Sequence, residues 1–290
     1  MKNLVYSMSL LFCLGFSAIA QNVENEFNPA YANKRGVYLL PQAGNMALGF
    51  DATPFLDIFS SSSNPFDGFN GVDNSIYWKY FVQDNRALRA RLTLNMLNET
   101  WSGEIEDDAT NTADDATKID TERLSQTAVT LGLGYEFRRG NGRVQGYYGA
   151  ELSFGFQAGK TLYEYGNKMT EDNTFPTTYN FGDNIIMENP GIDLLVRATE
   201  MKQGNKLSVG LGGFIGVEYF FAPQISIGGE FWLGVQFATM AQGEGSAEWY
   251  DQWEDDKLIV ETEKIDTFWN SRQFDIFSRT SGRVFLMFHF

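Results

Sequence analysis

Apolar and polar residues alternate one by one through the stretch Leu207 to Phe237, on both sides of a tight turn at Ala222–Gln224. A repeat of two places successive side chains on opposite faces of a β-strand. One face here is almost wholly apolar, whereas the other carries small, polar and charged residues. Each run is long enough for a tilted membrane-crossing strand, which needs ~9–11 residues. The pattern favours the wall of a membrane barrel, with lipid outside and a polar interior.

Six further segments alternate in the same way and bring the expected number of strands to eight. The six lie at 45–52, 75–82, 87–97, 126–138, 143–157 and 280–290. Three short turns then alternate with four long loops, at 53–73, 98–122, 158–205 and 239–279. A soluble sandwich shares the alternation, but the uneven connections and the aromatic last strand favour an all-β, antiparallel, up-and-down membrane barrel. Short turns of outer-membrane barrels are periplasmic and long loops extracellular, so both termini are expected in the periplasm.

A ten-stranded barrel is the alternative to eight strands. Residues 178–186 and 192–199, joined at Asn189-Pro190-Gly191, could supply two more strands. Their alternation is poor on the side that would face lipid, so an extracellular hairpin is preferred there.

The N-terminus has the features of a secretory signal peptide. Lys2 precedes a short apolar core, and Ala18-Ile19-Ala20 resembles a cleavage site, so the expected signal is 1–20. Cys13, the sole cysteine, would leave with it. Residues 21–44 are expected to form a periplasmic segment and 45–290 the outer-membrane barrel. No later segment has the ~18 consecutive apolar residues of a membrane helix.

The net charge of −15 argues against nucleic acid as a partner, because nucleic acid requires a positive surface. The acidity belongs to the predicted loops, and 98–122 alone holds nine acidic residues and one lysine. A solvated surface is the simpler interpretation of this loop. Calcium binding is the alternative, but no spacing matches an EF-hand. The acidic residues concerned are Glu104, Glu106, Asp107, Asp108, Asp114 and Asp115.

Charges of both signs fall on the predicted inner face. They are Asp51, Lys79, Arg89, Arg91, Glu136, Glu151, Glu218, Glu230 and Arg283. An eight-stranded barrel is just wide enough for its own side chains, and unpaired buried charge is costly. The sequence therefore predicts a paired network and a filled lumen, with glycines such as Gly132 and Gly134 leaving room for bulky neighbours. Arg86, Arg138, Arg139 and Arg143 cluster at the predicted periplasmic turns, where they could meet lipid phosphates or cap the strands.

The sequence carries little sign of catalysis. After loss of the signal, His289 is the one histidine, and it lies at the expected periplasmic rim rather than at the extracellular face. No thiol, histidine-containing metal cluster or phosphate loop is recognised. We expect a non-enzymatic protein with no cofactor and no metal.

Three stretches resemble outer-membrane β-barrel proteins that are common in Bacteroidota: Gly216–Phe231, Tyr135–Ala150 and Leu40–Phe50. The architecture is also similar to that of the small OmpX and OmpW barrels. The resemblance implies a barrel in the outer membrane, in contact with its lipid, and assigns no catalytic residue.

Three functional hypotheses follow. The leading one is a structural or accessory protein that binds other outer-membrane proteins through acidic loops bearing Trp249, Tyr250, Trp253, Phe268 and Trp269, because aromatic residues suit protein interfaces. The second is a narrow channel for small or apolar solutes. The third is an enzyme acting on lipid or peptide.

Overall fold

The computed structural model describes residues 38–52, 74–109, 116–140, 142–179, 181, 196–251, 257–263, 271–276 and 281–290. The regular structure in these ranges is β-strand throughout. None of these residues forms a helix long and apolar enough to cross a membrane.

The described part of the chain contains eleven strands, and all pair antiparallel in one sheet. They are β1 (Met46–Asp51), β2 (Asn74–Gln83), β3 (Arg86–Glu106), β4 (Thr117–Arg139), β5 (Val144–Glu164), β6 (Arg197–Ala222), β7 (Ile225–Met240), β8 (Glu244–Asp251), β9 (Lys257–Glu263), β10 (Ser271–Ile276) and β11 (Ser281–His289).

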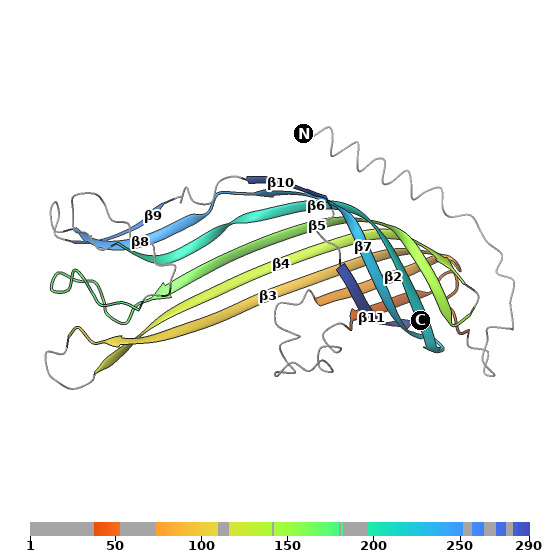
Figure 1. Cartoon of the computed structure of the whole chain (residues 1–290), viewed down its shortest axis with the longest axis horizontal. Helices are drawn as coiled ribbons and strands as arrows, with labels where there is room; N and C mark the ends of the chain where they lie inside the picture. The colour runs from red at the N-terminus through yellow and green to blue at the C-terminus, as the bar shows by residue number, and fades with distance from the viewer. Residues whose placement is uncertain are drawn as a thin grey trace.

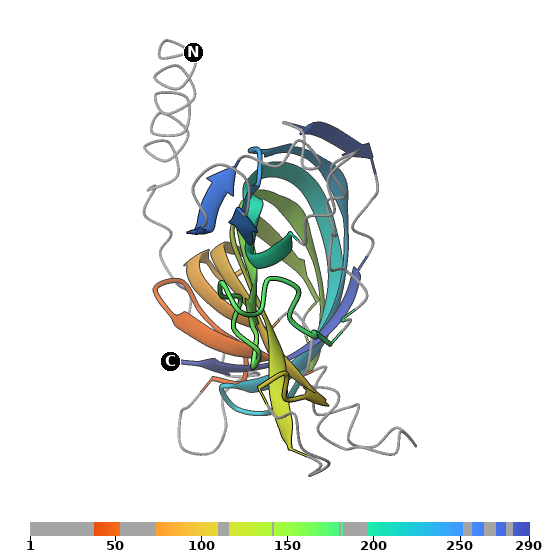
Figure 2. The same ribbon diagram turned by 90° about the vertical axis from the view of Figure 1, so that its left-hand side faces the viewer.

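Eight of these strands close into a ring, which confirms the predicted barrel. The order is β7-β11-β1-β2-β3-β4-β5-β6, and the β6–β7 hairpin closes it. Figure 2 looks into this ring from the side where the strands extend furthest. The ten-stranded alternative does not describe the ring: residues 197–199 belong to β6, and 182–195 lie outside the described residues.

The central strands are much longer than the sequence pattern predicted. β3 and β4 stay paired from Arg86↔Phe137 to Glu106↔Thr117, so most of the predicted loop 98–122 is a continuous hairpin. The predicted loop 158–205 likewise contains the ends of β5 and β6. These boundaries were wrong because the outer face is largely polar there, and the alternation of apolar with polar residues ends where the apolar outer face ends.

The predicted loop 239–279 also contains strands. β10 pairs with β7 over Val235–Met240, beyond the part of β7 that pairs with β11. β8 pairs with residues 197–202 of β6 and with β9. We call residues 98–106, 117–125, 158–179 and 197–205 together with β8 and β9 the extension. Figure 1 shows the extension as a long curved sheet that projects from one end of the ring.

The outer face of the ring is apolar on every strand. Along β6, alternate residues are exposed, including Leu211 at 57% and Ile215 at 63%, while their neighbours are buried. Cross-strand register continues this surface around the barrel, as in the row Leu92, Leu131, Phe154, Val209 and Phe237. A continuous exposed band of this size in water would be strongly unfavourable.

The other end of the ring carries the short turns and the C-terminus. Its short turns join β2 to β3, β4 to β5 and β6 to β7, and Gln224 in the last of them adopts a positive φ of 67°. Residues 43–44 of the predicted periplasmic segment lie against this rim, since the Gly44 amide donates to Phe81 O at 2.8 Å and the Ala43 amide to Asp84 Oδ1 at 2.8 Å. We call this end of the ring, with its short turns and the C-terminus, the turn end. Residues 1–37, including the predicted signal peptide, lie outside the described residues.

Candidate functional site: an ion-paired lumen

Inward-facing side chains fill the half of the ring nearer the turn end. Strand alternation directs charged and aromatic residues inward, and glycines on the same face make room for them. A Cβ on Gly132 would lie 2.5 Å from Glu151 Oε1, and one on Gly134 3.0 Å from Arg89 Cγ. The long side chains therefore occupy the space that the glycines leave, and they form a plug across the lumen.

The part of the plug nearest the turns is centred on Glu218, which is fully buried. Arg138 Nη2 donates to Glu218 Oε2 at 2.8 Å, and Lys79 Nζ lies 3.5 Å from the same oxygen. Both cations also pair with Glu136, Lys79 at 2.9 Å and Arg138 at 2.8 Å. Two carboxylates and two cations thus alternate in a closed, neutral cluster.

A second cluster lies one layer farther from the turns. Arg89 makes two hydrogen bonds to Glu230, at 2.5 and 3.0 Å, and lies 3.4 Å from Glu151. Arg91 donates to Glu151 through Nε and Nη2, at 3.1 and 2.5 Å. Arg89 Nη1 also lies 3.8 Å from Glu136 Oε2, which joins the two layers. Such bidentate arginine–carboxylate pairs are among the strongest hydrogen bonds in proteins.

Aromatic side chains fill the remaining space between the ion pairs. Lys79 Nζ lies 4.7 Å from the ring centroid of Tyr147, and Arg89 Cζ lies 4.0 Å from that of Phe214. Tyr77 and Phe285 pack against each other at 5.5 Å. The buried apolar core of the plug comprises Ala47, Tyr77, Phe81, Ala87, Tyr147, Phe214, Trp232, Phe285 and Met287. The rings exclude water, so each ion pair depends on its own partners for solvation.

Two predicted members of the network are placed less centrally. Asp51 is buried and is not isolated. Arg283 lies opposite Glu230 on the neighbouring strand and is half-buried, and its Nη1 atom has no hydrogen-bond partner among the described residues.

Arg138 lies beside the turns, as the sequence predicts, but its side chain points into the lumen and is 3% exposed, so it neither caps a strand nor meets lipid phosphate. Strand alternation in the sequence predicts this direction: Phe137 and Arg139 face outward, so the residue between them must face the lumen. With Arg138 included, five acidic and five basic side chains face the interior of the ring.

His289 lies beside two residues that resemble the partners of a catalytic histidine. Its Nε2 is 3.0 Å from both Ser226 Oγ and Glu218 Oε1. The serine hydroxyl donates to that same Glu218 oxygen. In a nucleophilic triad the carboxylate binds the opposite ring nitrogen, Nδ1, which here has no hydrogen-bond partner among the described residues. The geometry therefore orients the imidazole between Phe81 and Phe220 rather than activating Ser226.

The extension has a small core of its own. Segment 165–179 covers the inner face of its tip, where the Gly166 and Tyr179 amides donate to Asp120 at 2.7 and 2.8 Å. The Asn167 amide group donates to Glu106 O at 2.8 Å and Thr177 O at 3.2 Å. Ile105, Tyr163, Met169, Ala198 and Tyr250 are buried around these bonds. Burial also raises the pKa of Tyr165, whose hydroxyl donates to Ala198 O at 2.6 Å.

The candidate calcium ligands are dispersed or engaged with protein donors. Lys118 pairs with Asp107 at 2.7 Å and thereby lowers its carboxyl pKa. Partial burial of Asp108 is outweighed by donors from Asn173 and Thr177, so its carboxyl pKa is also lowered. Glu104 and Glu106 are exposed on the outer face, and 114–115 lie outside the described residues. The described residues contain no group of three acidic, histidine or cysteine side chains arranged to hold a metal ion.

The five aromatic residues proposed for partner binding are described only in part. Tyr250 is buried in the core of the extension and is not available as a surface anchor, whereas Trp249 is half-buried on β8. Trp253, Phe268 and Trp269 lie outside the described residues.

Together, the apolar exterior, the closed ring and the charged interior define a membrane-spanning β-barrel, in which each ring strand pairs with a neighbour on both sides. The sequence matches no protein-family model and no curated protein. Two solved structures align over most of the chain. The outer membrane protein OprG from Pseudomonas aeruginosa covers 87% of this chain and 98% of its own, at 10% identity and a TM-score of 0.32. A major outer membrane protein from Thermus thermophilus covers 85% and 98%, at 12% identity and a TM-score of 0.32.

Proposed function

We propose that this chain is a non-enzymatic outer-membrane barrel protein with a closed lumen, which acts as a structural or accessory subunit through its extension. The observation that carries the proposal is the ion-paired plug. Its cations and carboxylates balance, and aromatic rings fill the gaps between them. A pore selective for ions would instead be lined by charges of one sign.

The extension supports an interaction role. It projects beyond the apolar band, and its strands carry polar residues on the outer face, such as Glu104 and Glu106. It keeps its shape through its own buried core and through Arg197, which donates to Glu248 at 2.6 Å and to Asn167 O at 2.9 Å. A rigid, acidic surface presented outside the membrane suits recognition of another protein, since little ordering cost remains on binding.

The orientation follows the general rule for outer-membrane barrels. Short turns face the periplasm and long connections face outward, so we place the turn end and both termini in the periplasm and the extension at the cell surface. This arrangement belongs to a diderm bacterium, in keeping with the resemblance to barrels of Bacteroidota. The expected partners are outer-membrane lipid and other outer-membrane proteins.

A deletion tests the role of the extension. A variant without residues 243–269 joins β7 directly to β10, whose Ser271 already pairs with Met240, and removes β8, β9 and all five aromatic candidates. Native gels and mass spectrometry of gently solubilised membranes should show a stoichiometric complex for the wild type and a lone barrel for this variant. A variant without residues 110–115, which shortens the β3–β4 connection alone, serves as the control.

Heat-modifiable migration on gels checks that each variant still forms the barrel. A complex that survives the loss of 243–269 would contradict a role for β8 and β9, and a lone wild-type barrel would contradict an accessory role altogether. In that case steady single-channel currents would support the channel hypothesis. Lipid or peptide turnover that is lost in His289→Ala would support the enzyme hypothesis.

A further inference from the structure

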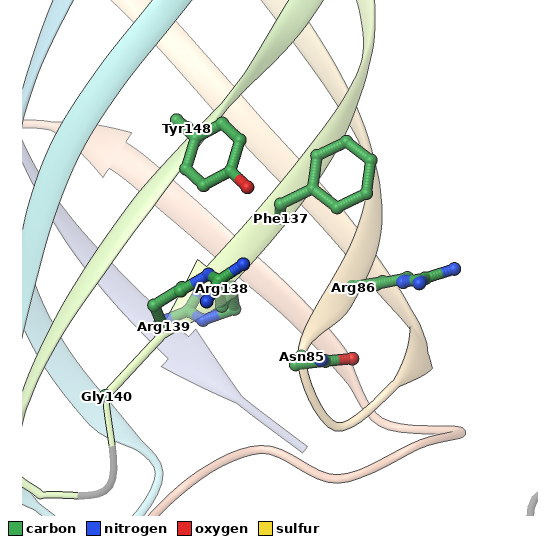
Figure 3. Close-up of a pocket in the computed structure, with 7 residues that line it drawn as sticks. All are labelled: Asn85, Arg86, Phe137, Arg138, Arg139, Gly140 and Tyr148. Atoms are coloured by element: carbon green, nitrogen blue, oxygen red, sulfur yellow. The ribbon is translucent and has the colours of Figure 1, made fainter.

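A pocket of about 380 Å³ opens on the outside of the barrel at the turn end. Its lining comes from two neighbouring hairpins: Asn85, Arg86, Phe137, Arg138, Arg139, Gly140 and Tyr148. Figure 3 shows the Phe137 and Tyr148 rings above Arg138 and Arg139, with Arg86 and Asn85 beside them on the neighbouring hairpin. The pocket therefore combines an apolar wall with a strongly basic edge.

Strand register explains why this combination faces outward. Arg86 pairs with Phe137 and Phe137 with Tyr148 across three neighbouring strands, so all three lie in one row on the outer face. Arg139 follows Phe137 by two residues on β4 and lies on that same face. Phe137 and Tyr148 are the last outward aromatic residues before the turn on β4 and β5, and Arg139 lies just beyond Phe137, toward the turn.

Two of the arginines lack an acidic partner. Arg86 and Arg139 are exposed, and neither has a carboxylate within 4 Å among the described residues. Arg86 instead places its guanidinium 5.7 Å from the centroid of the Phe137 ring, which does not neutralise it. The nearby Asp84 accepts from the Ala43 amide.

The neighbouring Arg138 and Arg143, by contrast, have their guanidinium groups bonded within the protein. Arg138 is buried against Glu136 and Glu218. Arg143 Nη1 caps the adjacent hairpin by donating to Phe220 O and Phe221 O, both at 3.0 Å. Arg86 and Arg139 make no comparable bonds within the described residues, so two positive charges remain for an external anion.

We infer that this pocket binds the headgroup phosphate of an anionic glycerophospholipid in the leaflet at the turn end. Guanidinium groups match phosphate geometry through paired hydrogen bonds. The stacked Phe137 and Tyr148 rings, 5.5 Å apart, lie where the glycerol and first acyl carbons would pack. The apolar wall favours a lipid over free phosphate, because a free anion gains nothing from it. The inference rests on the proposed membrane location.

Native mass spectrometry of the full-length protein tests this assignment. The protein, released from neutral detergent micelles, is titrated with phosphatidylglycerol, and phosphatidylcholine and inorganic phosphate are titrated separately. The test variant carries Arg86→Gln and Arg139→Gln. The control carries Arg123→Gln and Lys202→Gln, which remove two exposed positive charges from the extension.

The wild type and the control should bind phosphatidylglycerol alike, and the test variant roughly 25-fold more weakly, because each basic side chain at an anionic lipid surface contributes a factor of about five. Equal binding by test and control variants would overturn the inference. So would equal binding of phosphatidylcholine, or displacement of the lipid by millimolar inorganic phosphate.

A second variant and a second readout keep the outcome interpretable. Tyr148→Ala removes one ring of the apolar wall and keeps both charges, so it should weaken the lipid and leave the weak binding of inorganic phosphate unchanged. Insertion into phosphatidylcholine vesicles is measured for every variant by heat-modifiable migration. Failure of the wild type to insert would refute the proposed membrane location, whereas insertion without a preference for phosphatidylglycerol would refute the lipid site alone.

Discussion

Replacement of Glu218 by Gln removes one charge from the centre of the plug and leaves the volume of the side chain unchanged. Glu218 and Glu136 together balance Lys79 and Arg138 in the layer nearest the turns. After the substitution, Glu136 alone faces both cations, and one buried positive charge is uncompensated. The new side chain can place its NH2 group in one of two positions. In one position the NH2 group faces Lys79 and Arg138, which are themselves donors. In the other it replaces the oxygen that contacts Ser226 and His289, and those hydrogen bonds are lost.

The expected loss of stability is large for a single isosteric change. Removal of one partner from a buried ion network destabilises a protein by roughly 3–5 kcal/mol. The value should fall at the upper end here, because Glu218 is fully buried and contacts four polar side chains. The outer face of β6 is unchanged, so insertion into lipid should still occur.

Urea unfolding in lipid vesicles, followed by tryptophan fluorescence and linear extrapolation, measures this difference. Glu164→Gln is the matched control, because Glu164 pairs with Arg123 at 2.9 Å while both side chains are about half exposed. Exposed pairs contribute roughly 0–1 kcal/mol. If Glu218→Gln lowered the free energy of unfolding by no more than Glu164→Gln, the plug would not be a stabilising network and the reasoning would fail.

Three further predictions concern packing and the extension. Gly216→Ala should destabilise the barrel by roughly 1–3 kcal/mol, because the added Cβ would lie 2.6 Å from Gly229 O and 2.3 Å from the Tyr147 ring, whereas Gly282→Ala, with nothing within 4 Å, should be nearly neutral in the same unfolding assay. Asp120→Ala should release segment 165–179, seen as faster hydrogen exchange there with an unchanged barrel; unchanged exchange would contradict its anchoring role. Asp107 and Asp108 have carboxyl pKa values that are lowered in the folded state. The stability that they contribute is therefore present above the unfolded pKa of about 4 and is lost as the pH falls through the folded values. Hydrogen exchange in the tip of the extension, corrected for the intrinsic rate, should accelerate in acid, and a pH-independent corrected rate would exclude this linkage.

The sequence predicts the ring well because lipid imposes one pattern on all its strands. An outward face must be apolar at every second position, so alternation locates β6 and β7 and even the inward direction of Lys79 and Glu218. The same reasoning fails beyond the band. Residues 98–106 and 117–122 are held as strands by backbone pairing. Their few apolar residues, such as Ile105, are too widely spaced to give a hydrophobic period of two.

The sequence predicts that the charged side chains in the lumen pair, but not which residue pairs with which. Charge balance predicts that the acidic and basic residues pair, but the choice of partners depends on barrel register and shear, which bring Arg89 of β3 to Glu230 of β7 across the ring. Ser226 and Asn167 were missed for the same reason, because a single small polar residue gives no signal until its neighbours in space are known. The inward direction of the Arg138 side chain, by contrast, follows from strand alternation alone.

Single-channel recording in planar bilayers tests the closed, ion-paired lumen most directly. The purified wild-type barrel should insert and remain electrically silent across the voltage range that the bilayer tolerates. Glu218→Gln, which breaks the ion pairs nearest the turns, should show at most brief current spikes from transient opening of the plug. A steady, ohmic conductance from the wild-type protein would contradict the account, because no continuous current can pass a lumen that these buried side chains fill.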